Sequence, residues 1–208
     1  MTKRQQQQNL SQSRDGGYTI IESLVAMVVV AVLMIAIAPV MAFSVATRVQ
    51  ARRVELATQA ARTYIDALRT GAIKQGVAGF PIPAPAGDLA GAPVPTLADT
   101  YCVDMDGDTT PAPCETRSNK EFRVQGAWLN QDVTGTDPTS KGYQLLVRVY
   151  RVDSFPGVSL KPPKNATKQS VVGSGLGDKS IPVVEMSTEI PATGDPSYRS
   201  FSDRLKKP

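Results

Sequence analysis

Four acidic residues lie close together in the segment YCVDMDGDTTPAPCE, and their spacing matches that of calcium ligands. Asp104, Asp106 and Asp108 alternate, and Glu115 occupies the twelfth position counted from Asp104. Side-chain oxygens at these positions bind Ca²⁺ in EF-hand loops. The match fails at the sixth position, where Thr109 replaces the glycine that the turn of such a loop requires. Two interpretations stay open, a calcium site and a solvated acidic turn.

The same carboxylates give little support for catalysis. The chain has no histidine, which excludes Ser-His-Asp and Cys-His sites and removes the commonest metal ligand. The acidic residues are neighbours in one loop, and nothing else in the sequence completes a catalytic constellation. A secreted hydrolase with paired carboxylates is therefore the weakest hypothesis. We predict that the chain is not an enzyme and that it has no cofactor besides the candidate calcium ion.

Charge and length limit the remaining functions. The chain has 208 residues, enough for one domain plus an appendage. Its net charge of +4 is small and scattered, and no basic patch interleaved with aromatic residues occurs. Nucleic acid is therefore not a predicted partner.

Two cysteines, Cys102 and Cys114, enclose most of the acidic segment. In an oxidising compartment such a pair is expected to form a disulfide. Closing so short a loop would stabilise the fold by about 2–3 kcal/mol. Free buried cysteines are the alternative.

A single carboxylate, Glu22, lies at the start of a membrane-length apolar segment. No charged residue occurs from Ser23 to Thr47, and a helix needs about 20 apolar residues to cross a bilayer. An ordinary anchor leaves Glu22 unexplained, because a carboxylate at the centre of a membrane helix costs about 2.5–3.5 kcal/mol. A cleaved secretory signal fits poorly, because its apolar core is only about 7–15 residues long.

Cleavage between Gly17 and Tyr18 would supply the missing partner for Glu22. The new α-amine would lie about one helical turn from the carboxylate. Glu22 would also fall in the first turn of the helix, where the helix dipole favours a negative charge. The acid is therefore explained if Tyr18 is the mature N-terminus.

The segment GGYTIIESLVAMVVVAVL resembles the N-terminus of type IV pilins and type II secretion pseudopilins. Gly17 matches the glycine before the cleavage site, Tyr18 the first mature residue, and Glu22 the family's glutamate. Most members begin with Phe, so Tyr18 departs slightly from the pattern. Pro39 lies where many members have a helix-kinking proline, and we expect a kink or local melting near it.

The resemblance implies a route into a filament. A prepilin peptidase would cut after Gly17 and N-methylate Tyr18, and the helix would hold the subunit in the lipid of the inner membrane. An assembly platform would then move it into a filament of pilin or pseudopilin subunits. There Glu22 would pair with the Tyr18 amine of a neighbour, and Pro39 would contribute to assembly. The head would lie in the periplasm and later in an extracellular or periplasmic filament.

Helical periodicity continues beyond the apolar segment. Apolar residues recur at three- and four-residue steps and predict a stripe that packs on a globular head. Gly71 is a plausible C-cap. The predicted stripe consists of Ala57, Ala61, Tyr64, Ile65 and Leu68.

The rest of the chain predicts a small antiparallel sheet, giving an α+β fold in which a long N-terminal helix packs on the sheet. Its three expected strands span 121–129, 143–152 and 182–190. The predicted parts are a cleaved leader at 1–17, a transmembrane or filament-core half-helix at 18–47, an amphipathic half-helix at 48–75, a Pro/Ala/Gly-rich loop at 76–98, a β-rich head at 99–190 and a polar tail at 191–208.

Two functions from different classes follow. The first is a structural filament subunit, a minor pilin or pseudopilin that serves pilus assembly, motility or secretion. The head segments FRVQGAWL, LLVRVYRVDSF and PVVEMSTEI are also similar to those of a cyanobacterial minor-pilin group linked to hormogonium polysaccharide secretion. The second is a membrane-anchored adhesin or polysaccharide-binding protein that does not polymerise. Loss of Glu22 separates them, because only a subunit needs that carboxylate for assembly.

Overall fold

The computed structural model divides the chain into two compact units, Met1–Ala42 and Phe43–Pro208. Each unit is considered by itself. The structure describes residues 19–85, 88–107, 114, 118, 120–129, 138–155, 157–161, 177–193, 198 and 202.

Helix α1 (Ile20–Arg69) is 50 residues long and belongs to both units. Its apolar side chains from Ile20 to Val45 are largely exposed. A helix that is apolar all round belongs in a core or a membrane, and α1 is long and apolar enough to cross a bilayer. The helix continues through Pro39, so the backbone there is not melted. It ends at Arg69, and Gly71 follows with a positive φ of 71°, as expected for a C-terminal cap.

The second unit contains a five-stranded sheet. Its strands are β1 (Ile82–Pro83), β2 (Thr100–Asp104), β3 (Glu121–Leu129), β4 (Tyr143–Arg151) and β5 (Val184–Ile190). β3, β4 and β5 pair antiparallel in that order. On the other edge of β3, β2 pairs antiparallel and the two-residue β1 pairs parallel. The predicted α+β fold is confirmed; because of β1 the sheet is mixed.

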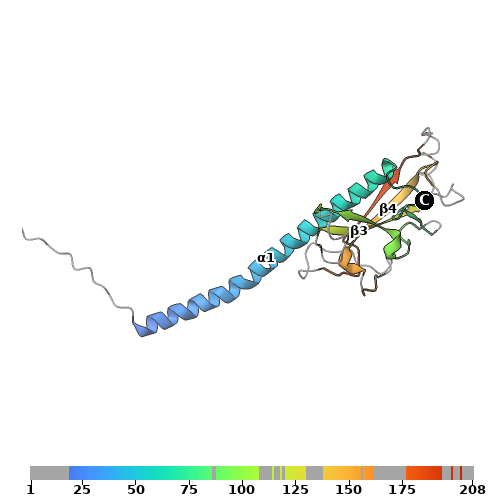
Figure 1. Cartoon of the computed structure of the whole chain (residues 1–208). Coiled ribbons are helices and arrows are strands. Elements are labelled where there is room, and N and C mark those ends of the chain that lie inside the picture. The colour runs from blue at the N-terminus through green and yellow to red at the C-terminus, as the bar shows by residue number, and fades with distance from the viewer. Residues whose placement is uncertain are drawn as a thin grey trace, which may run out of the picture. The chain divides into compact units, whose positions relative to one another are not determined.

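One face of this sheet packs on the C-terminal part of α1, which lies beside β3 and β4 in Figure 1. The predicted apolar stripe is buried, together with Ala60. It contacts alternate strand residues, because side chains along a strand point to opposite faces. Tyr64 is fully buried and its hydroxyl donates a 2.7 Å hydrogen bond to Gly79 O. Burial raises the pKa of the Tyr64 phenol. The helix-facing strand residues are Phe122, Val124, Trp128, Leu145, Val147 and Val149.

The Pro/Ala/Gly-rich segment covers the opposite face of the sheet. Ala92 packs with Ala127 and Leu146, and Ile82 and Leu89 flank this small cluster. The sequence predicts this segment only as a connecting loop. Because this segment also covers the sheet, β3 and β4 are buried on both faces.

Candidate functional site

The first turn of α1 places Glu22 where the helix dipole favours a negative charge. The Glu22 backbone N–H donates to Thr19 Oγ1 at 3.3 Å and to Thr19 O at 3.0 Å. Thr19 and Glu22 have the spacing of a capping box, in which such a threonine satisfies a free N–H at the helix start. Sequence reasoning missed this role of Thr19, although the pattern T-x-x-E before an apolar run signals it. Gly17 and Tyr18 lie outside the described residues.

The acidic cluster of the head forms around the end of β2. Asp104 pairs with Glu121 across β2 and β3, and Asp106 follows in the turn after β2. One carboxylate oxygen from each of these three residues lies within 4.8 Å of the others. Of the predicted ligands, the structure therefore brings Asp104 and Asp106 together. Asp108 and Glu115 lie outside the described residues.

Glu121 is the member of this cluster that sequence reasoning missed. It is distant from Asp104 along the chain, and only the register of β2 on β3 brings the two together. Glu121 is 6% exposed. Its Oε1 accepts a 3.0 Å hydrogen bond from the Cys114 backbone N–H.

The disulfide Cys102–Cys114 lies beside the cluster, with 5.9 Å between the two Cα atoms. It connects β2 to Cys114, whose backbone contacts Glu121. The predicted pairing is therefore present, and both sulfurs are unavailable as thiolate ligands.

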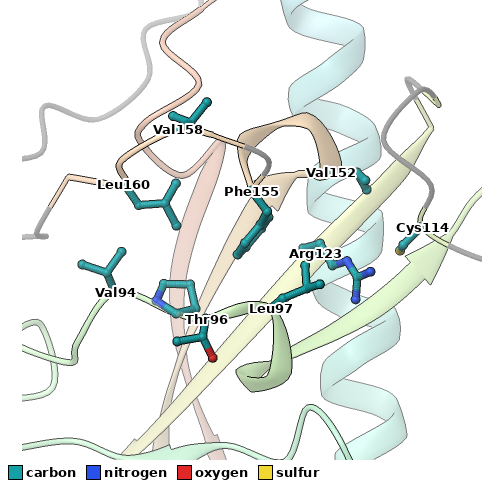
Figure 2. Close-up of a pocket in the computed structure, with 10 residues that line it drawn as sticks. Val94, Thr96, Leu97, Cys114, Arg123, Val152, Phe155, Val158 and Leu160 are labelled. Atoms are coloured by element: carbon teal, nitrogen blue, oxygen red, sulfur yellow. The ribbon is translucent and has the colours of Figure 1, made fainter.

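A hollow of about 510 Å³ lies beside this disulfide, since Cys114 is one of its lining residues. Figure 2 shows its side chains, which come from residues 94–97 at the start of the short helix Leu97–Asp99, from Cys114, from β3 and from the segment after β4. Burial lowers the pKa of the Arg123 guanidinium, while the charge of Glu121 raises it. An apolar hollow with one cation suits an apolar group that carries an anion. The described lining consists of Val94, Pro95, Thr96, Leu97, Cys114, Arg123, Val152, Phe155, Val158 and Leu160.

Comparison with known proteins bears on the N-terminus. Residues 12–38 match the family model described as the prokaryotic N-terminal methylation motif. This match supports the resemblance of the N-terminus to that of type IV pilins and pseudopilins. No curated protein and no solved structure matches the chain.

The matched range contains Gly17, Tyr18 and Glu22, and it ends one residue before Pro39. The motif supports processing by prepilin peptidase. Together with the exposed apolar part of α1, it indicates a membrane anchor.

Proposed function

We propose that this pilin-like chain is a minor pilin or pseudopilin, a structural subunit of a type IV pilus-like or type II secretion-like filament. The methylation motif at 12–38 carries this proposal. It includes the start of α1, which has Glu22 in its first turn and no charged residue from Ser23 to Thr47. A plain membrane anchor gives no reason for this carboxylate.

In this proposal, cleavage after Gly17 frees the Tyr18 amine, which is then methylated. The amine and Glu22 lie about one helical turn apart in the sequence. In the filament core the carboxylate pairs with the amine of a neighbouring subunit. Each charge then compensates the other in an apolar environment, where an unpaired charge is costly.

Before assembly, the apolar part of α1 holds the subunit in the inner membrane with the head in the periplasm. The exposed side chains of that part have no cover within the described chain, and lipid or neighbouring helices would bury them. An assembly platform would transfer the subunit into the filament. The head motifs that resemble minor pilins of polysaccharide secretion favour a secretion filament within this proposal.

Replacing Gly17 with Asp should block processing. A charged side chain beside the cleavage site would leave the unprocessed chain in the membrane, and its amine would be too far from Glu22 for pairing. Immunoblots of membrane and sheared-filament fractions should show only the longer chain, confined to the membrane.

Gln8→Ala, a leader change away from the cleavage site, is the matched control and should be processed and assembled normally. Processed Gly17→Asp protein in filaments at the wild-type level would contradict the proposed function.

A further inference from the structure

The end of β2 and the start of β3 hold three carboxylates in a small volume. Asp104 and Glu121 are direct cross-strand partners, and Asp106 lies two residues beyond Asp104. One oxygen from each residue lies within 4.8 Å of the others. The three side chains therefore converge from two strands and the turn that follows β2.

Hydrogen bonds hold two of these carboxylates in place. Asp104 Oδ1 accepts from the backbone N–H groups of Asp106 at 2.8 Å and Gly107 at 3.2 Å. Asp106 Oδ2 accepts a 2.6 Å hydrogen bond from Ser118 Oγ. These hydrogen bonds orient both carboxylates.

Glu121 supplies an independent indication of a ligand. Its side chain is more than nine-tenths buried, with the residue 6% exposed. Its Oε2 is buried and has no hydrogen-bond partner among the residues that the structure describes. A buried carboxylate oxygen without a partner costs free energy, so a partner of another kind is expected there.

The three acids bring negative charge together in a small volume. Negative charges this close repel one another. The Arg123 guanidinium interacts electrostatically with Glu121 and offsets one negative charge. A bound cation would offset this repulsion and would give Glu121 Oε2 a partner.

We propose that Asp104, Asp106 and Glu121 form a calcium site in the head. Ca²⁺ binds oxygen ligands at about 2.3–2.6 Å, so two oxygens on opposite sides of the ion are about 4.6–5.2 Å apart. The 4.8 Å limit on the three oxygens fits that span. Zinc is disfavoured because the chain has no histidine and both cysteines form the disulfide.

Such an ion would connect β2, the turn after it and β3, beside the backbone of Cys114. It would therefore stabilise the head in addition to the disulfide. Because the site has three carboxylates but no complete calcium loop, we expect it to bind Ca²⁺ as weakly as extracellular calcium-binding modules do, with a Kd on the order of 10⁻⁴–10⁻³ M. This site is independent of the proposed filament function, because it involves no residue of the methylation motif.

The test uses the full chain in detergent micelles after treatment with EDTA. Calorimetric titration with CaCl₂ gives the affinity, and a parallel titration with MgCl₂ gives the selectivity. Thermal unfolding followed by the fluorescence of Trp128, the only tryptophan, reports on the head alone. The variants are Asp104→Asn and Glu121→Gln, each of which keeps an oxygen for the existing backbone donors. Asp66→Asn, an exposed acid on α1, is the control.

We expect saturable calcium binding by the wild type and a higher unfolding temperature with the ion. Both cluster variants should bind at least about tenfold more weakly, because each loses a charged ligand, while Asp66→Asn should match the wild type. No saturable calcium heat, unchanged binding in the cluster variants, or magnesium binding as tight as calcium binding would overturn the proposal. Should Glu121→Gln fail to fold, Asp104→Asn alone decides.

Discussion

Replacing Glu22 with Ala should remove the subunit from filaments and leave it in the membrane. Loss of the carboxylate makes α1 more apolar, so insertion should be at least as efficient as in the wild type. The methylated Tyr18 amine, however, would enter the filament core without its partner. An unpaired charge in an apolar environment costs several kcal/mol, so incorporation should fall by about 100-fold or more. Quantitative immunoblots of sheared filaments and membranes measure both effects.

Glu55→Ala is the matched control for this experiment. Glu55 lies on the same helix and pairs with Arg52 at 2.9 Å, but both side chains are more than half exposed. Such surface pairs contribute about 0–1 kcal/mol, so assembly should be unchanged. Normal incorporation of Glu22→Ala would favour the alternative of an anchor whose acid has no role in assembly.

Arg148→Ala should cause the largest loss of head stability. Arg148 is 1% exposed, and its guanidinium donates to Glu185 Oε2 at 2.8 Å, Ala92 O at 2.9 Å and Ala90 O at 2.7 Å. Removing it leaves these acceptors without their donor and detaches the covering segment from β4. Glu185 is 28% exposed, so water can still solvate its carboxylate. Each buried acceptor left without a donor costs about 1–3 kcal/mol, so we expect a total loss on the order of 3 kcal/mol. Urea unfolding of the full chain in detergent, followed by Trp128 fluorescence, measures the change in the free energy of unfolding.

Arg69→Ala provides the comparison, because Arg69 is exposed and makes one long contact of 3.4 Å with Thr188 Oγ1. Its effect should stay within about 0.5 kcal/mol. Equal effects of the two substitutions would show that the guanidinium of Arg148 does not hold the covering segment on the sheet.

The sequence predicted the regular elements that have a long periodic pattern. The stripe from Ala57 to Leu68 repeats at helical spacing, and the strands at 121–129, 143–152 and 182–190 match β3, β4 and β5 within two residues. In these segments the local pattern and the tertiary packing agree, so each element could be recognised without knowledge of its neighbours.

Short elements and the second cover of the sheet could not be predicted in this way. β1 has only two residues, and β2 lies in a segment whose sequence pattern predicts an acidic turn. The segment before β2 lacks periodicity, because alanine and proline pack on the sheet without forming a helix or a long strand. Arg148, a charged residue within an apolar strand, is a sign that polar groups cover that face of the sheet. Its acceptors lie more than fifty residues away in the chain, so the local sequence does not identify them.

In the candidate site, too, some residues have a local sequence pattern and others are placed only by tertiary packing. Asp104 and Asp106 stand out by their alternation, and the disulfide by its short loop and expected compartment. Glu121 has no local signal, because its place beside Asp104 depends on the pairing of β2 with β3. The N-terminal motif is different, since it consists of contiguous residues and can be recognised directly in the sequence.

Mass spectrometry of the N-terminal peptide of the native protein tests the central claim most directly. The account predicts a chain that begins at Tyr18 and carries one added methyl group on its α-amine. That result would establish prepilin processing and explain the carboxylate of Glu22. An intact N-terminus at Met1, or a chain that begins after Ala46, would contradict the filament proposal and leave an anchored or secreted head.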